Sequence, residues 1–356
     1  MTPIAYPFWV WALFFGVVLA ALFVDIGIVN RKSHAPSRKE TLVWSSVWVS
    51  LALLFAGFVF LQFGAFKAKE FLTGYLIELS LSIDNLFVFL LIFNFFRVPL
   101  KYQHRALFWG IFMALVMRLL MIFAGVELVE RFDWTLYLAG AFLIYTGIKM
   151  FGEDEAFEPE DSFLVKTATR FVPISKNYEG DRFFVMENGR RTGTLLLLVL
   201  IVINVADLIF AVDSIPAIFG ITTDRFIVYT SNIFAILGLR TFYFLLADVA
   251  DRFHYLKYGL AFILTFIGVK MVLPLIVGGL LLLMGEGSSG AFADLLRRFQ
   301  AHDEGILQMV INVSLGVVVV SIAASIVLSL IFPRPESEMV GLLEETQDSS
   351  DEPGVI

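Results

Sequence analysis

The sequence contains no cysteine among its 356 residues. That absence excludes disulfide bonds, thiolate metal ligands and redox chemistry at cysteine. Histidine is also scarce: there are four, and each falls in an expected loop. An intramembrane zinc site built from soft ligands is therefore not expected. The chain also lacks a patch rich in lysine and arginine, so we expect no nucleic-acid partner.

Positive charge is missing from the N-terminus as well. No lysine or arginine precedes the first apolar run, residues 8–29. A signal peptide begins with basic residues and has a shorter apolar core. We therefore interpret this run as a retained first helix. The formal net charge is −7, and much of it comes from an acidic tail, 333–356, that we expect to be disordered and cytoplasmic.

Apolar residues are what the chain has in excess. They make up 58% of it, and the mean hydropathy is +0.82, far outside the range of a soluble domain. Apolar runs of about 18 or more residues recur, which is enough to cross roughly 30 Å of hydrocarbon as helix. We predict an all-α polytopic membrane protein in contact with the lipid bilayer. Nine transmembrane helices are predicted, at 8–29, 42–63, 72–95, 106–126, 134–151, 194–215, 226–247, 256–277 and 306–332.

The connections between these helices give the orientation. Of the 26 lysines and arginines, 17 lie in or beside the odd-numbered loops and the tail, and 7 in or beside the even-numbered loops. Because positive loops stay in the cytoplasm, the N-terminus is predicted outside and the C-terminus inside. The cytoplasmic loop 152–193 carries Asn188-Gly189 between strand-like residues, which predicts a β-hairpin. The connection 285–305 is predicted to be external, with a short helix at 291–300.

Two apolar stretches, 74–95 and 194–218, carry carboxylates within their length. A carboxylate at mid-bilayer costs about 2.5–3.5 kcal/mol on insertion scales, so such a residue is rarely incidental. In both stretches an acid is followed six residues later by an aspartate and then by a small polar residue. These residues are Glu78, Asp84 and Asn85 in the first stretch and Asp207, Asp213 and Ser214 in the second. The shared pattern indicates a cation site between them.

The two stretches belong to a longer internal repeat. Adding 129 to positions 78, 84 and 85 gives 207, 213 and 214, and adding 121 to Gly147-Ile148-Lys149-Met150 gives Gly268-Val269-Lys270-Met271. The units are 64–151, helices three to five, and 194–284, helices six to eight. Residues 1–63 supply two N-terminal helices and 306–332 the ninth. An odd number of crossings per unit predicts an inverted-topology repeat, the architecture of many secondary transporters.

The candidate ligands do not all share one helix face. On a regular helix Glu78 and Asp84 lie roughly 120° apart, whereas Glu78, Ser82 and Asn85 share a face. Either the helices break near the aspartates, or the acids form two layers along a path. Pro216 favours a break because it removes a backbone donor. The eighth segment stays apolar to residue 284 across Pro274, which leaves room for a break and a short extra helix.

The candidate donors are hard oxygens, which suit Mn²⁺, Ca²⁺ or Mg²⁺ rather than zinc or copper. They are Glu78, Asp84, Asn85, Asn204, Asp207, Asp213 and Ser214. Four carboxylates exceed one divalent charge, so Arg118 and Arg240 are candidate charge partners, and proton exchange would couple to metal release. Each arginine is equally well explained as a simple neutraliser of a nearby acid. Asp25 is a further ligand or an entry-path acid, or else a helix-end acid that reaches the membrane interface.

The motifs Glu78–Leu86 (ELSLSIDNL) and Asn204–Ala217 (NVADLIFAVDSIPA) resemble the paired signatures of the TerC family of integral membrane proteins, in its Alx-type branch. The resemblance covers roughly residues 8–333. It implies a bacterial inner-membrane protein of the LysE-like transporter superfamily, associated with manganese efflux, with no tightly bound cofactor. Family names also carry tellurium resistance and redox labels. Tellurite is an anion that four acids would repel, and a redox role has no cysteine to act through.

Two other functions compete with export of a divalent cation. Two aspartates on different membrane helices could form an intramembrane aspartyl protease dyad. That enzyme would need Tyr-Asp and Gly-x-Gly-Asp contexts, and Asp84 and Asp213 have neither. A non-transporting stress-response factor could instead act on partners through the cytoplasmic loop and tail, but it would leave the paired acids without a purpose. We therefore expect a transporter and no enzyme.

Overall fold

A computed structural model describes residues 6–24, 38–152, 175, 178–187, 190–247, 255–284, 296, 298, 301 and 303–332. Most of these residues are helical, and the sheet among them has two strands. The predictions for Asp25 and for the tail 333–356 concern residues outside these ranges. So does the predicted short helix at 291–300, apart from residues 296 and 298.

Most of the described helices have the length and composition of membrane spans. In chain order the elements are α1 (Phe8–Val24), α2 (Arg38–Phe95), α3 (Leu100–Arg131), α4 (Thr135–Gly152), β1 (Phe184–Glu187), β2 (Arg190–Gly193), α6 (Leu195–Phe219), α7 (Arg225–Leu237), α8 (Leu239–Ala247), α9 (Leu256–Met284) and α11 (Glu304–Ile331). Among the described residues six helices are long and apolar enough to cross a bilayer, and the bent pair α7–α8 makes a seventh. The predicted all-α polytopic membrane fold is confirmed.

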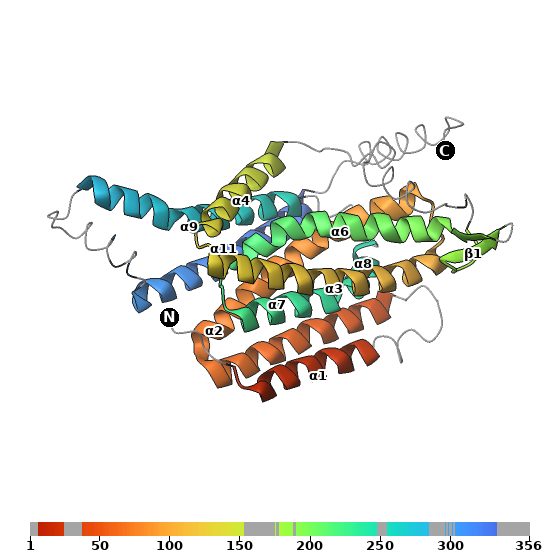
Figure 1. Ribbon diagram of the computed structural model, residues 1–356, viewed down its shortest axis with the longest axis horizontal. Helices are drawn as coiled ribbons and strands as arrows, with labels where there is room; N and C mark the ends of the chain where they lie inside the picture. Colours follow the sequence, from red (N-terminus) through yellow and green to blue (C-terminus); the bar gives the residue numbers. More distant parts are fainter. Residues whose placement is uncertain are drawn as a thin grey trace.

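The second and third predicted segments are joined more tightly than expected. Instead of a loop over 64–71, α2 turns at a single residue, Gly64, whose φ of 86° and ψ of 174° are open essentially only to glycine. Figure 1 shows the halves of α2 as two rods that meet at this bend and run back toward the same side. The predicted loop was wrong because a glycine can reverse the chain within one residue. We call this end of the molecule the bend end.

The proline positions also differ from expectation. α6 continues through Pro216 to Phe219, and α9 is one helix through Pro274 to Met284, so the predicted breaks near both prolines were wrong. Pro216 removes only the one hydrogen bond that its nitrogen would donate to the carbonyl oxygen of Val212, and α6 ends three residues later at Phe219. The seventh segment bends instead, by 44° at Gly238 between α7 and α8. A Cβ on Gly238 would lie 2.5 Å from Phe242 Cε2, so a side chain has no room there.

Helices α4 and α9 cross at closely packed glycines. A Cβ built on Gly147 would lie 2.8 Å from the carbonyl oxygen of Ala261, and one on Gly268 would lie 2.6 Å from the carbonyl oxygen of Gly140. The helix backbones therefore touch at both places, an approach that small residues permit. Figure 1 shows α4 lying across α9 on one side of the bundle formed by α2, α3, α6 and α7.

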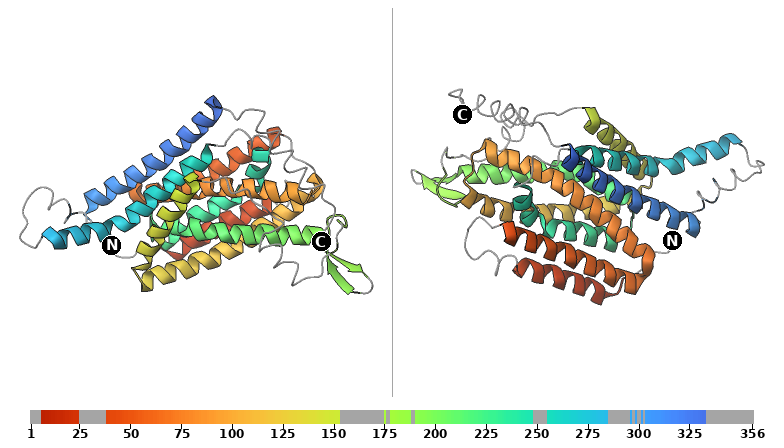
Figure 2. Two further views of the ribbon diagram at one scale, coloured as in Figure 1. Left: turned by 90° about the horizontal axis from the view of Figure 1, so that it is seen from above. Right: turned by 180° about the vertical axis from the view of Figure 1, so that it is seen from behind.

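The hairpin marks the other end of the molecule. β1 pairs antiparallel with β2, with Glu187 opposite Arg190, on either side of residues 188–189. Tyr178 Oη donates to the carbonyl oxygen of Phe96 at 2.7 Å, and Arg105 Nη1 lies 2.5 Å from Asp181 Oδ2. These contacts hold the segment before the hairpin against the α2–α3 connection. In both views of Figure 2 the hairpin projects beyond the helix ends.

Candidate functional site

Four polar residues meet in the middle of the bundle, one each from α2, α3, α6 and α7. They are Glu78, Arg118, Asp207 and Asn232, with exposed fractions of 1%, 1%, 4% and 0%. We call them the central cluster. Each helix also supplies apolar side chains to the surrounding core, so the cluster is enclosed by protein. A buried ion costs several kcal/mol unless it is paired, which makes the contacts within this group decisive.

Arg118 is the cation that joins the cluster. Its Nη1 contacts Glu78 Oε1, and its Nη2 lies 3.6 Å from Asp207 Oδ1. Nη1 also donates to Asn232 Oδ1 at 3.5 Å. The Asn232 amide is oriented by its other end, because Nδ2 donates to the carbonyl oxygen of Val228 at 3.2 Å. One guanidinium therefore bridges an acid from each repeated unit.

The cluster and its surroundings retain unused polar atoms. Among the described residues, Glu78 Oε2, Ser82 Oγ, Arg118 Nε and Ser214 Oγ are buried and have no hydrogen-bond partner. Buried polar atoms nearly always have a hydrogen-bond partner, so a group of unpaired ones is typical of a site that binds a polar ligand or water. Most of these atoms are oxygens, the donors that hard divalent cations prefer. These residues are therefore the candidates to hold a divalent cation.

Asp84 and Asp213 lie outside the central cluster. Asp213 Oδ1 accepts from Thr146 Oγ1 of α4 at 3.5 Å. Asp84 lies within electrostatic range of Lys257 on α9. Both aspartates are half-buried, whereas Glu78 and Asp207 are buried. Because α2 and α6 run unbroken past these positions, the acids form two sets on two faces: one toward Arg118, the other toward α4 and α9.

The remaining predicted residues lie in different places. Asn85 is buried, with 6% exposed, on the face of α2 that carries Glu78. Asn204 lines an apolar groove of about 400 Å³ beside Trp109 and Phe184, and its Nδ2 donates to the carbonyl oxygen of Leu200 at 2.7 Å. The structure therefore does not bring Asn204 into the central cluster. Arg240 is buried in α8.

Sequence reasoning missed several polar residues on the same helices. Asn232 follows Thr230 and Ser231 in a predicted span and has no repeat partner, so its only signal was a short polar stretch within an apolar segment. At the bend end Lys67 bridges Glu70 and Asp224, and Tyr6 joins them. Lys67 and Glu70 stand at i and i+3, a spacing that predicts an ion pair on a helix. Because residues 64–71 were predicted to be a loop, this helical spacing was not recognised.

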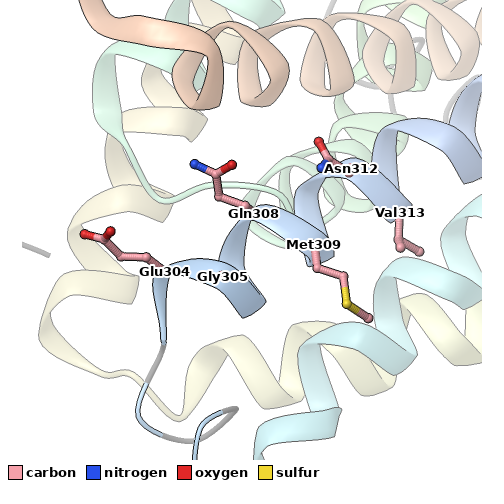
Figure 3. Close-up of a pocket in the computed structure, with 6 residues that line it drawn as sticks. All are labelled: Glu304, Gly305, Gln308, Met309, Asn312 and Val313. Carbon is pink, nitrogen blue, oxygen red and sulfur yellow. The ribbon is translucent and has the colours of Figure 1, made fainter.

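A cleft of about 560 Å³ also opens at the bend end, beside the start of α11. It is lined by Glu304, Gly305, Gln308, Met309, Asn312 and Val313. In Figure 3 the Gln308 and Asn312 side chains project from one side of α11 and Met309 from the other. Asn312 Oδ1 accepts from Lys69 Nζ of α2 at 2.6 Å, so α11 is held to the segment after the bend.

Comparison with known proteins places this architecture in a family. A family model described as "Integral membrane protein TerC family" matches residues 63–337, more than half of the chain. The chain belongs to the TerC family. This TerC-family chain is 51% identical over 264 residues to an uncharacterized membrane protein of Myxococcus xanthus, covering 74% of this chain and 83% of that one.

Two further relatives carry a functional name. Proteins named "Putative membrane-bound redox modulator Alx" are 48% identical over 273 residues in Escherichia coli K12 and 47% identical over 296 residues in Photorhabdus laumondii. The matches cover 74% and 80% of this chain, and 85% and 91% of the relatives. No solved structure matches the chain. The TerC-family resemblance of the two acidic motifs is confirmed, and the protein is an integral membrane protein.

Proposed function

We propose that this TerC-family protein exports a divalent metal cation, Mn²⁺ first among the candidates, across the bacterial inner membrane. The observation that carries the proposal is the bridge of Arg118 between Glu78 and Asp207, at the centre of the bundle. Two carboxylates from two repeated units are held around one positive charge. A transported cation needs the same arrangement, with an ion in place of the side chain.

The charge of the cluster favours a cation of higher valence. Glu78 and Asp207 carry two formal negative charges, and one guanidinium offsets one of them. A divalent ion brings twice the charge of the guanidinium and takes several oxygen ligands, so it competes for both carboxylates. A monovalent ion brings no more charge than Arg118 already supplies. Arg118 thus acts as a tethered counter-ion that a divalent cargo displaces.

The symmetry of contacts supports an inverted repeat around the site. Adding 121 to positions 140 and 147 gives 261 and 268, so the contacts Gly147–Ala261 and Gly140–Gly268 exchange into each other. Such exchange is expected of two halves related by a pseudo-twofold axis, the arrangement that underlies alternating access in transporters.

The proposal is tested by metal content in cells. Elemental analysis would compare cells expressing wild type, Glu78→Gln, Asp207→Asn, Asp84→Asn, Asp213→Asn or no protein, after growth in excess Mn²⁺. Wild type should lower cellular manganese, and the first two variants should abolish that effect. Arg131→Gln, which alters an exposed ion pair with Glu127, serves as the matched control and should behave as wild type. Equal manganese content in all cells would refute export of this metal; parallel calcium and magnesium readings would identify a different cargo.

Orientation and energy source belong to the same proposal. The charge bias of the loops supports a cytoplasmic hairpin, an external bend end and a cytoplasmic tail. Export against a gradient requires coupling, and protons are the proposed partner. The redox name carried by the relatives suggests a second role, but this chain has no cysteine, so such a role would have to run through a partner protein.

A further inference from the structure

A second cation bridge joins the two repeated units at the bend end. Lys67 Nζ of α2 lies 2.8 Å from Glu70 Oε2 and 2.7 Å from Asp224 Oδ2, just before α7. Tyr6, ahead of α1, donates its hydroxyl to the same Asp224 oxygen at 2.7 Å. We call these four residues the terminal network. Its lysine and both acids have side chains exposed by 12% or less, so the bridge is largely withdrawn from solvent.

Asp224 couples the network to the position of α7. Its Oδ1 accepts from the backbone nitrogens of Phe226 at 3.1 Å and Ile227 at 3.4 Å, which makes it the N-cap of that helix. The other oxygen, Oδ2, accepts the hydrogen bond of Tyr6 and forms the ion pair with Lys67. A single carboxylate thus both starts α7 and fixes it to the bend of α2. The first turn of α7 cannot move away from α2 while Lys67 holds both acids.

The network and the central cluster lie about two helical turns apart along the same contact between α2 and α7, which we call the seam. Glu70, Gly74 and Glu78 are one helical turn apart on α2, so Glu70 is roughly 12 Å from Glu78 along the axis. Asn232, which contacts Arg118, lies two turns after Asp224 on α7. Between them a Cβ on Gly74 would lie 2.6 Å from Ile218 Cδ1 and 3.0 Å from Ser231 Oγ. The seam between the two bridges is closed by direct contact.

We infer that the terminal network is a gate on the bend-end side of the central cluster. This inference rests on the proposed transport function and names the closure that alternating access requires. With Lys67 between Glu70 and Asp224, the bend end is shut. When the bridge breaks, the two carboxylates repel each other, and the seam opens beside Gly74. The bend at Gly64, three residues before Lys67, gives the α2 side of the gate a turning point.

Because the chain has no cysteine, the gate is testable by labelling one introduced thiol. Ser231→Cys puts that thiol on the seam between the bridges, at a residue that is fully buried. The protein would be reconstituted in vesicles and exposed to a membrane-impermeant maleimide on the bend-end side. We expect slow labelling in the Ser231→Cys protein and labelling several-fold faster after adding Lys67→Met. Lys67→Arg, which keeps the positive charge, should remain slow, and so should the Arg131→Gln control.

Unchanged labelling of the Lys67→Met protein would overturn the gate, provided that it elutes and melts like its parent. Fast labelling of both Lys67→Met and Arg131→Gln would overturn it too, because any lost ion pair at this end would then have the same effect. A closed-state cross-link gives an independent reading. Cysteines at Gly74 and Ser231, whose Cβ atoms would lie 3.3 Å apart between the two bridges, should stop manganese export when oxidised to a disulfide, while cells with the reduced pair still export.

The labelling and transport readouts separate the two proposals. If labelling responds to Lys67 but no cell exports a metal, the gate stands and the exporter fails. If export is normal in the cross-linked variant, the exporter stands and the gate fails.

Discussion

Arg118 Nη2 lies 3.6 Å from Asp207 Oδ1, although the arginine belongs to the first repeated unit and the aspartate to the second. The same guanidinium contacts Glu78, the residue to which Asp207 corresponds in the repeat. The polar core is thus shared between the two units rather than owned by either. Removing the shared cation leaves two buried carboxylates unpaired, whereas removing one acid leaves the cation with the other.

Arg118→Gln is expected to destabilise the folded protein by about 3–5 kcal/mol, because it leaves buried carboxylates without their cation. The apparent melting temperature in detergent should fall sharply. The double variant Glu78→Gln/Arg118→Gln should recover part of the loss, since it removes one of the stranded charges. Arg131→Gln, in an exposed ion pair with Glu127, should cost less than about 1 kcal/mol. A double variant no more stable than Arg118→Gln would contradict the pairing.

The sequence predicted those parts of the fold that depend on local composition. Apolar length identified each long helix, and the repeated acids at Glu78 and Asp207 led to the residues that the structure brings together on Arg118. Whether those residues bind a metal stays a prediction. Local composition did not predict the one-residue turn at Gly64, because a glycine flanked by apolar residues looks the same in a helix and in a turn. Nor did it predict the bend at Gly238.

The rest of the site depends on contacts between helices far apart in the sequence. The terminal network needs Asp224 beside Lys67, which follows only from the packing of α7 on α2. Asn204 matched a family motif, yet it faces a groove between α3 and α6, because its place on α6 turns it away from Arg118. Helical spacing separated Glu78 from Asp84 correctly, but it did not reveal which neighbouring helix each would meet.

The turn at Gly64 gives a prediction with a control seven residues away. Gly64→Ala places a Cβ at a φ of 86°, and holding a non-glycine residue there costs about 1–3 kcal/mol. Gly57→Ala lies within the same helix and meets nothing within 4 Å, so it should be neutral or stabilising by up to about 1 kcal/mol. The melting temperature should therefore fall for Gly64→Ala and stay unchanged or rise for Gly57→Ala. A stable Gly64→Ala variant would mean that the bend is absent.

The crossing of α4 and α9 predicts a symmetric effect of two substitutions. Gly147→Ala would place a Cβ 2.3 Å from Thr265 Oγ1 and 2.8 Å from Ala261 O, and Gly268→Ala would meet the backbone of Gly140 and Ile144. Each should cost about 1–3 kcal/mol as overpacking. Gly316→Ala, in α11 with nothing within 4 Å, is the matched control and should not destabilise. Melting in detergent measures all three; a large loss for only one of the first two would contradict equivalent packing.

Tyr6 predicts the behaviour of the terminal network at alkaline pH. Burial raises the pKa of the Tyr6 hydroxyl well above its usual range, and the hydrogen bond to Asp224 and the negative charge of that residue act in the same direction. A folded-state pKa above the unfolded value stabilises the protein fully below the unfolded pKa, near 10, and that contribution is lost as pH rises through the folded value. Tyr6 should therefore stay protonated at pH 11, where exposed tyrosines have ionised.

The ultraviolet absorbance of tyrosinate measures this directly, as the difference between wild type and Tyr6→Phe. The two titrations should coincide through pH 11, because the substitution removes a group that has not yet ionised. Tyr178→Phe provides the comparison: burial also raises the pKa of Tyr178, so its removal should leave the same range unchanged. A loss of tyrosinate signal near pH 10 in Tyr6→Phe would show an exposed hydroxyl, and Asp224 would then hold α7 to α2 through Lys67 alone.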